Sequence, residues 1–351
     1  MAADTDQQAH DGEDRGGEGD GEGPDGLDTA RLEGWLAEHV PGSEPPFAYE
    51  RIAGGRSNLT YRVADAGGGA WILRRPPLGG TLGSAHDMGR EHRILTALDA
   101  TDVPSPTPVA FCDDHDVTGA DFYVMELVDG AVLRDEDLVA EAFPDPADRR
   151  RVGEAVVDTL VTLHAVDPDA AGLGELGRRA GYAERQLKRW NKQWEASKTR
   201  ELESMEETHR LLSARVPEQQ GVALIHGDYR LDNMIVAPDG SIAAVVDWEL
   251  CTLGDPLADV GLLNVYWAES TDRVVPLTRA PTMAEGFPTR QELMDRYAER
   301  SGRDLAALGF FIALGYWKLA AILEGVYARY AAGAYGETTD EFQAFAEIVE
   351  Q

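Results

Sequence analysis

Apolar residues in the first part of the chain occur in short runs that glycine and turn residues interrupt. Between residues 47 and 130 these runs are rich in aromatic and β-branched side chains, a pattern typical of β-strands. FAYERIAGG, SNLTYRVAD and GAWILRRPP predict a three-stranded antiparallel meander, and TPVAFCDD and DFYVMELVDG predict two further strands. In SAHDMGREHRILTALDA the apolar residues recur at helical spacing, so one helix is expected there, with Ser84 as its cap.

The second part of the chain shows helical periodicity almost throughout. RRVGEAVVDTLVTLHAVDP places its valines and leucines on one face of a helix. A strand pair is expected at 222–226 and 234–247, where DGS is a turn signal. The other apolar stripes predict helices near 182–198, 200–214, 256–268, 289–301, 305–331 and 338–349.

Together these elements predict an α+β fold with two lobes. Residues 27–130 are expected to form a small antiparallel sheet with one packed helix, after a helix that Asp28 caps and Pro41 ends. Residues 131–351 are expected to form a larger, mainly helical lobe, with a cleft where the lobes meet. Residues 1–26 alternate glycine with acidic residues and bury too little apolar surface to offset chain entropy, so we expect a disordered tail.

Charge narrows the range of partners. The chain has 351 residues, and 63 acidic against 32 basic residues give a formal net charge of −31. This charge argues against nucleic acid or an anionic membrane as the main partner. Two explanations of the acidity stay open: adaptation to a high-salt cytoplasm, where charge repulsion is screened, and an acidic protein without such adaptation.

Cysteine usage and the N-terminus favour a cytoplasmic protein. Cys112 and Cys251 are too few for a disulfide framework and have no metal-ligand spacing. No uninterrupted apolar run reaches the roughly 20 residues of a membrane helix. The N-terminus also lacks a basic start followed by an apolar stretch.

Residues 224–236 read LIHGDYRLDNMIV, in which a polar cluster interrupts an apolar run. Buried carboxylates need partners. Asp228 and Asn233 lie five residues apart, and Asp247 follows the apolar run IAAVV, so loop and strand ends can bring the three together. One carboxylate can orient an acceptor hydroxyl, while an amide oxygen and a second carboxylate are hard ligands for Mg²⁺. This spacing predicts phosphoryl transfer from a nucleotide.

HGDYRLDN and VVDWE resemble the catalytic and metal loops of the aminoglycoside phosphotransferase and choline kinase family. GGRSNLTY, ILRRPP, SAHDMGREHRIL and CTLGDPLADVG are most similar to the kinase domains related to those fused to some acyl-CoA dehydrogenases. The resemblance covers roughly residues 30–345 and implies a bilobal protein-kinase-like fold that uses ATP and Mg²⁺. No Asp-Phe-Gly or Ala-Pro-Glu segment follows Asp247, which disfavours a protein kinase.

The resemblance also implies roles in the second lobe. Asp228 would be the catalytic base, and Asn233 and Asp247 would be the Mg²⁺ ligands. His226 would hold the loop through a backbone hydrogen bond. In the segment GDPLAD, Asp255 would cap the next helix, and Asp259 would brace the catalytic loop through Arg230.

In the first lobe the resemblance implies a nucleotide site. Backbone N–H groups of a glycine-rich turn can approach phosphates closely, and the residues in that position are Gly54, Gly55, Ser57 and Asn58. Arg74 takes the place of the family's phosphate-binding lysine, and Glu91 would pair with it. An arginine keeps the charge and adds a bidentate fork, but it is not equivalent to lysine. The backbone of Glu126 and Val128 would bind the adenine edge.

The acceptor is left open between several classes. The subfamily resemblance suggests a hydroxy acid or hydroxyacyl thioester, whereas acidic side chains would suit an aminoglycoside or a choline-type amino alcohol. A third possibility is a nucleotide-binding regulatory module with weak catalysis, which the Arg74 departure favours. Candidate linings of the acceptor pocket are Trp190, Trp194, Tyr266, Trp267, Tyr316, Trp317 and Glu324.

Overall fold

The five strands predicted in the first part of the chain form one antiparallel sheet in the computed structural model, in the order β1-β2-β3-β5-β4. The structure describes residues 27–52, 58–77, 87–272, 275, 280–331 and 348–349. The strands are β1 (Ala48–Arg51), β2 (Leu59–Ala64), β3 (Ala70–Arg75), β4 (Pro108–Cys112) and β5 (Phe122–Glu126).

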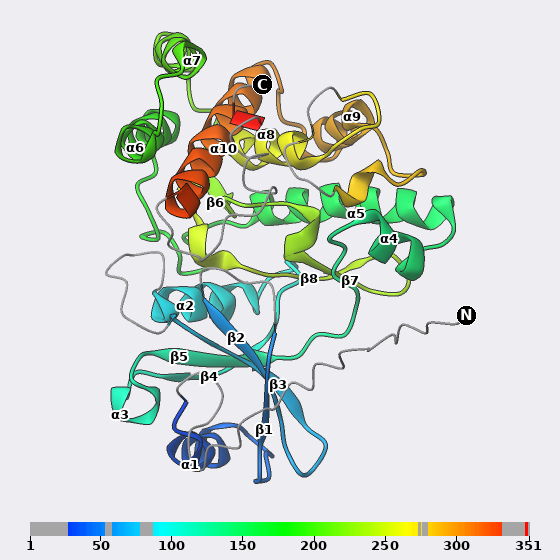
Figure 1. Ribbon diagram of the computed structural model, residues 1–351. Coiled ribbons are helices and arrows are strands. Elements are labelled where there is room, and N and C mark those ends of the chain that lie inside the picture. Colours follow the sequence, from blue (N-terminus) through cyan, green and yellow to red (C-terminus); the bar gives the residue numbers. More distant parts are fainter. Residues whose placement is uncertain are drawn as a thin grey trace, which may run out of the picture.

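Each face of this sheet is covered by one helix (Figure 1). On the outer face, α1 (Thr29–His39) buries Leu32 and Leu36 in a cluster with Tyr61 and Leu73. On the other face, α2 (Met88–Leu98) packs with Ile72 in a cluster that continues into the helical part. Ile72 and Leu73 therefore serve different cores, because successive residues of a strand point to opposite faces.

The rest of the described chain is mainly helical, which confirms the predicted α+β architecture. In Figure 1 the helices from α4 onward lie on the far side of α2 from the sheet, whereas α3 lies beside β4. The short helices α3 (His115–Thr118) and α4 (Glu136–Ala142) were not predicted. The others follow the predicted stripes and are α5 (Pro146–Ala165), α6 (Tyr182–Ser197), α7 (Glu203–Ser213), α8 (Leu257–Tyr266), α9 (Arg290–Ser301) and α10 (Leu308–Ala331), with 3₁₀ turns η3 (Leu231–Asn233), η4 (Trp248–Leu250) and η5 (Pro281–Met283).

Four short strands lie between α7 and α8, and only part of their pairing was predicted. β7 (Met234–Val236) pairs with β8 (Ile242–Val245) across the expected turn. β6 (Ala223–Ile225) instead pairs with β9 (Thr252–Gly254), so the predicted pairing of 222–226 with 234–247 is wrong. The chain turns back after β8 and returns beside β6. The connections β6–β7 and β8–β9 are thereby brought next to one another.

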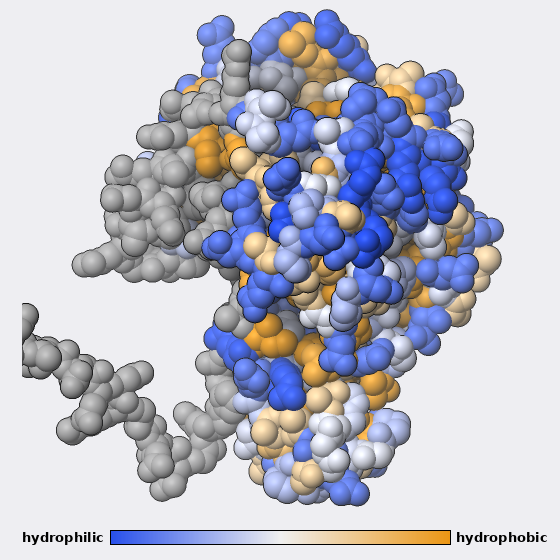
Figure 2. Space-filling model, turned by 90° about the vertical axis from the view of Figure 1, so that its right-hand side faces the viewer, coloured by the Kyte–Doolittle hydropathy of each residue, from blue (hydrophilic) through white to orange (hydrophobic). Residues whose placement is uncertain are grey.

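The helix α10 is long and apolar enough to cross a membrane, with a mean hydropathy of 1.4 over its most apolar stretch. The sequence reading missed it because Lys318 and Glu324 interrupt the apolar run. Half of that stretch is buried inside the protein, and Glu324 is fully buried in it. Partial burial against neighbouring helices is the pattern of a core helix. Figure 2 shows mostly hydrophilic residues on one face of the helical part and hydrophobic residues where it meets the sheet part.

Some predictions fall on residues outside the described ranges. These are the tail at 1–26, the residues Gly54, Gly55, Ser57 and Ser84, and most of the helix expected at 338–349. The helix α2 begins at Met88, and its cap is Asp87, whose side chain accepts a hydrogen bond from the Arg90 backbone at 2.9 Å. The cap was therefore placed three residues too early.

Candidate functional site

The loop between β6 and β7 is held in shape by its own histidine. Buried His226 contacts the Val246 carbonyl through Nε2 at 3.0 Å, and its Nδ1 accepts the backbone N–H of Asp228 at 3.2 Å. Together these contacts fit the tautomer with the proton on Nε2. Gly227 has φ +85°, and a Cβ there would lie 2.9 Å from the Leu250 carbonyl oxygen, so glycine is required. The predicted backbone contact of His226 is confirmed.

A buried carboxylate, Asp259 on α8, holds the same loop through its backbone. It accepts the backbone N–H groups of His226 at 2.6 Å and of Gly227 at 2.9 Å, and it contacts His164 Nε2 at 3.5 Å. Burial opposes the charged form, but these donors outweigh it and hold the pKa of Asp259 below its usual value. The predicted brace through Arg230 is wrong, because Arg230 pairs with other carboxylates.

Replacing Asp259 by asparagine is expected to destabilise the fold by about 3 kcal/mol. The side-chain NH₂ of asparagine would replace one carboxylate oxygen and would face a backbone N–H, so two donors would oppose each other. Urea unfolding measures this, with exposed Asp137→Asn as a control that should stay within about 0.5 kcal/mol of wild type. The depressed pKa means that the stabilisation is complete above the unfolded pKa of about 3.9 and is lost as pH falls through the folded pKa. The difference between wild type and variant should therefore shrink in acid. An unchanged unfolding midpoint at neutral pH would contradict this role.

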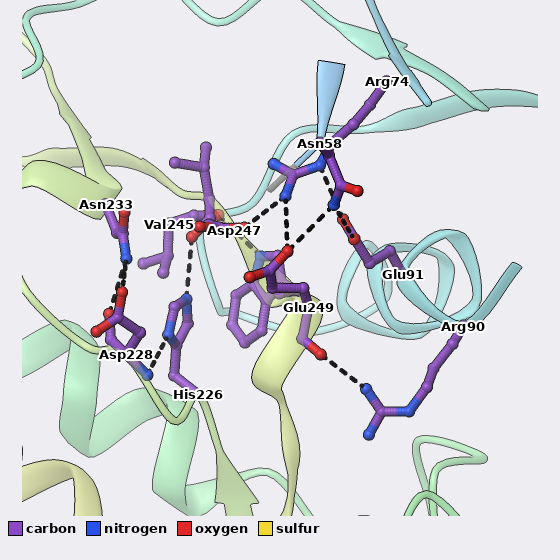
Figure 3. A network of polar contacts seen from close by, with 12 residues as sticks. Asn58, Arg74, Arg90, Glu91, His226, Asp228, Asn233, Val245, Asp247 and Glu249 are labelled. Atoms are coloured by element: carbon purple, nitrogen blue, oxygen red, sulfur yellow. Dashed lines mark hydrogen bonds and ion pairs between the residues drawn. The ribbon is translucent and has the colours of Figure 1, made fainter. Parts of the chain in front are cut away.

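Asp228 and Asn233 meet across the loop, as the spacing predicted. Asn233 Nδ2 donates to both the backbone oxygen of Asp228 at 2.9 Å and its carboxylate oxygen Oδ2 at 3.0 Å (Figure 3). Arg230 lies 3.5 Å from the same oxygen and pairs with Asp232 at 2.6 Å. The Asn233 amide oxygen is thus turned away from Asp228. Asp228 is oriented by an amide and a guanidinium on one side and is partly exposed on the other.

Asp247 stands at the start of the neighbouring loop in an unusual conformation. Its φ is +68°, and within the part of the chain that the structure describes no other residue except glycine has a positive φ. Such backbone strain is typical of functional sites. Its Oδ1 receives Arg74 Nη2 of β3 at 2.5 Å (Figure 3). This contact joins the sheet part to the helical part.

The guanidinium of Arg74 forks between three carboxylates. Nε lies 3.2 Å from Glu91 Oε2 on α2, and Nη2 lies 2.5 Å from Asp247 and 3.7 Å from Glu249. Burial alone would lower the pKa of Arg74, but the surrounding negative charges outweigh burial and raise it. The predicted pair of Arg74 with Glu91 is present, and Tyr123 supports it by donating to Glu91 at 2.9 Å.

The sequence reading missed Glu249 and Arg90. The Glu249 side chain accepts from Asn58 at 3.1 Å and its backbone oxygen from Arg90 at 3.3 Å (Figure 3). Arg90 also donates to the Cys251 carbonyl. The available signal was a second acid two residues after Asp247, in VVDWE. These contacts tie α2 to the loop that carries Asp247.

Asp228, Asn233, Asp247 and Arg74 thus come together from the sheet part and the helical part, and comparison with known proteins shows which family has this fold. A profile described as "Phosphotransferase enzyme family" matches residues 48–308. The chain belongs to this phosphotransferase family. It is 34% identical to human acyl-CoA dehydrogenase family member 11 over 334 residues, and 36% identical to the chicken protein of that name over 328 residues. These alignments cover 92% and 90% of this chain but only 42% of either relative.

Solved structures show the same fold. An aminoglycoside phosphotransferase-like protein from Ralstonia eutropha is 31% identical, with a TM-score of 0.78 over 92% of this chain and 96% of that one. Choline kinase from Cryptosporidium parvum has a TM-score of 0.62 over 92% and 95% of the two chains, at 13% identity. The second likeness shows the fold alone.

The donor set of this phosphotransferase fits a magnesium ion. Asn233 and Asp247 offer hard oxygens on adjoining loops, and Mg²⁺ in nucleotide sites takes one or two protein oxygens and completes its shell with phosphates and water. Among the described residues no group of three or more His, Cys, Asp and Glu side chains is arranged for a metal ion. Asn233 and Asp247 would hold the ion, and nucleotide phosphates and water would complete its shell.

The described residues that were predicted to bind the nucleotide have partners within the protein. Asn58 is buried, and its Nδ2 donates to Glu91 at 3.3 Å and to Glu249 at 3.1 Å, so donation to a phosphate requires breaking one of these bonds. The Glu126 N–H donates to the Thr107 carbonyl at 2.9 Å at the end of β5. The role of the Glu126 and Val128 backbone in binding adenine stays a prediction.

Arg74→Met is expected to raise the KM of this phosphotransferase for ATP by about 10–100-fold, because a charged phosphate donor is lost. Arg74→Lys should have a smaller effect, because it keeps the charge but loses the fork. Steady-state kinetics at saturating acceptor measure both, and exposed Arg62→Met on the same sheet is the control. Equal KM values for Arg74→Met and wild type would remove Arg74 from the nucleotide site.

Most of the proposed acceptor linings turn out to be core residues. Trp194, Trp267 and Trp317 are almost fully buried, and Tyr316 is exposed on the outer side of α10. Glu324 is buried and accepts from the backbone and hydroxyl of Thr199 at 2.8 and 2.6 Å. Of the seven residues, Trp190 and Tyr266 remain candidates for lining the acceptor pocket. Trp190 lines a small recess beside Gly227, and the Tyr266 ring lies 5.1 Å from the guanidinium of Arg230.

Proposed function

We propose that this chain is an ATP- and Mg²⁺-dependent kinase that transfers the γ-phosphoryl group to a hydroxyl of a small molecule. The observation that carries the proposal is the contact of Asp228 with Asn233 and of Asp247 with Arg74. The two loops adjoin where the Val246 N–H, next to Asp247, donates to the Asn233 carbonyl at 3.0 Å. These contacts support the proposal, because phosphoryl transfer requires a carboxylate that orients the acceptor beside groups that hold the metal and the phosphates.

The proposed reaction uses Asp228 as the proton acceptor. The acceptor hydroxyl donates to the exposed side of the Asp228 carboxylate, and its oxygen forms a bond to the γ-phosphorus. The bond from that phosphorus to the bridging oxygen of ADP breaks, and the hydroxyl proton passes to Asp228. Asn233 and Arg230 keep the carboxylate in place, and Arg74 faces the phosphates. The bound Mg²⁺ would neutralise phosphate charge, with Asn233 and Asp247 as its ligands.

We propose a hydroxy acid or a hydroxyacyl thioester as the acceptor. Supporting this choice, the relatives at 34–36% identity bear an acyl-CoA dehydrogenase name, although the chain spans less than half of their length. An aminoglycoside or amino alcohol is the alternative, supported by the fold likeness to choline kinase. The buried Glu324, already bonded to Thr199, weakens that alternative because it is not free to pair with a cationic acceptor.

A screen of ADP release tests the proposal. Hydroxy acids, hydroxyacyl-CoA compounds, amino alcohols and aminoglycosides are each added to the protein with Mg-ATP, at low and at molar KCl. Acceptor-dependent ADP release is expected for a hydroxyacyl compound. Release that no acceptor stimulates would favour the regulatory module, for which the arginine at position 74 is the supporting observation.

A further inference from the structure

Lys318 stands out as a lysine placed next to the proposed catalytic base. The chain has only four lysines, Lys188, Lys192, Lys198 and Lys318, in a protein with 63 acidic residues. Lys318 lies on α10, and its Nζ donates to the Gly227 carbonyl at 2.9 Å. Gly227 directly precedes Asp228. Within the described part of the chain this is the one hydrogen bond of Nζ, which leaves further donor capacity.

The ammonium group borders a small recess between α6, α8 and α10. Its volume is about 30 Å³, and its lining includes Tyr182, Gln186, Trp190, Gly227, Phe311 and Lys318. The Trp190 ring lies 5.4 Å from Lys318 Nζ, and its indole N–H donates to Gln186 at 3.0 Å. The recess has the volume of about one water molecule in the liquid, so it suits a single oxygen-bearing group and not a sugar ring.

Two cations beside this recess favour an acceptor that carries a partly or fully negative oxygen. Arg189 on α6 places its guanidinium 5.4 Å from the Trp190 ring, so two cations lie near that ring. Asp259 also lines the recess, and each of its carboxylate oxygens accepts a backbone N–H, from His226 and from Gly227. Asp228 is the proposed base. Burial lowers the pKa of Lys318, whereas Asp228 and Asp259 support its charged form.

We propose that Lys318 is the residue that selects the acceptor, its ammonium group donating to an acyl oxygen while Asp228 takes the hydroxyl of the same molecule. This inference rests on the proposed function. The acyl oxygen belongs to a carboxylate or to a thioester carbonyl, and either oxygen can accept a hydrogen bond from the ammonium group. A choline-type acceptor would place its cation against Lys318 and Arg189, which disfavours it.

The test compares acceptors with and without an acyl oxygen. The probes are 3-hydroxybutanoate and 4-hydroxybutanoate, their CoA thioesters, the neutral 1,3-butanediol and 1,4-butanediol, and choline. Wild type should prefer the hydroxyacyl probes. Lys318→Met should lower kcat/KM for those probes about 10–100-fold, the range for losing a charged hydrogen bond, with diol activity and the KM for ATP within about twofold of wild type.

Two further variants complete the experiment. Lys318→Arg should restore part of the hydroxyacyl preference, and Lys192→Met, a matched lysine change on exposed α6 surface, should have no effect. Should Lys318→Met not fold, as judged by circular dichroism, Arg189→Gln on the exposed side of α6 should lower the same preference by about twofold to fivefold. If Lys318→Met lowers kcat/KM for the free acids alone, the contact of Lys318 is with a carboxylate. If it lowers kcat/KM for both acids and thioesters, the contact is with the acyl oxygen that they share.

Three results would overturn the inference. Equal losses on diols and hydroxyacyl probes would mean that Lys318 only holds the Gly227 carbonyl. Phosphorylation of choline in preference to every hydroxyacyl probe would overturn the inference and leave the kinase proposal standing. ADP release that no hydroxyl compound stimulates would overturn both.

Discussion

Replacing Asp228 by asparagine is expected to lower kcat by about 10²–10⁴-fold, the range for losing a general base. Asparagine has nearly the same shape and can keep the contact with Asn233, so the loop should remain folded. It cannot accept the hydroxyl proton. The KM for ATP should change little, because Asp228 is proposed to contact the acceptor, whereas Arg74 and Asp247 are the residues proposed to bind the nucleotide phosphates and Mg²⁺.

Acceptor-dependent ADP release measures this effect. Asp232→Asn is the matched control in the same loop, since Asp232 pairs with Arg230 at 2.6 Å and lies outside the proposed reaction. It should keep kcat within about tenfold of wild type, the loss of one charged contact. Turnover of Asp228→Asn near the wild-type rate would remove Asp228 from the mechanism.

Replacing Asp247 by alanine should nearly abolish activity, with a fall in kcat/KM of about 10³-fold, because a metal ligand contributes several kcal/mol to the transition state. The variant also leaves Arg74 without its 2.5 Å partner. Nucleotide binding should lose its dependence on Mg²⁺.

Calorimetric titration of ATP with Mg²⁺ and with EDTA checks this second prediction. Glu249→Gln is the informative comparison, because Glu249 bonds Asn58 and Arg90 and is not a proposed metal ligand. Its activity should stay within about tenfold of wild type. Wild-type binding of ATP that is equally tight without Mg²⁺ would contradict the metal assignment.

Local patterns predicted most of the fold. The strands at 48–75 and the helices α5 to α10 follow apolar periodicities and turn residues that act within a few positions. The pairing of β6 with β9 was missed because it joins segments that lie on either side of a complete hairpin. Similarly, α10 was not recognised as a long apolar helix, because only uninterrupted apolar runs were counted. Its two interior charged residues, Lys318 and Glu324, have partners that are distant in the sequence.

In the candidate site, too, contacts between residues close in the sequence were predicted, and most contacts between distant residues were not. Asp228 and Asn233 meet within one loop, so their spacing was enough to predict the contact. Arg74 and Asp247 lie 173 residues apart, and only the resemblance to a family placed them together. Nothing local marks Lys318, because its partner Gly227 lies 91 residues away on another element. The brace of Asp259 on backbone N–H groups was likewise invisible, because backbone donors leave no trace in a sequence.

The most direct test of the central claim follows the γ-phosphoryl group itself. The protein, Mg-ATP and each hydroxyacyl probe are incubated together, and ³¹P NMR monitors ATP, ADP, inorganic phosphate and phosphate monoester. We expect ADP and a phosphate monoester to form in equal amounts, only when both acceptor and Mg²⁺ are present, and not with Asp228→Asn. ATP consumed to inorganic phosphate at the same rate with and without every acceptor would contradict it.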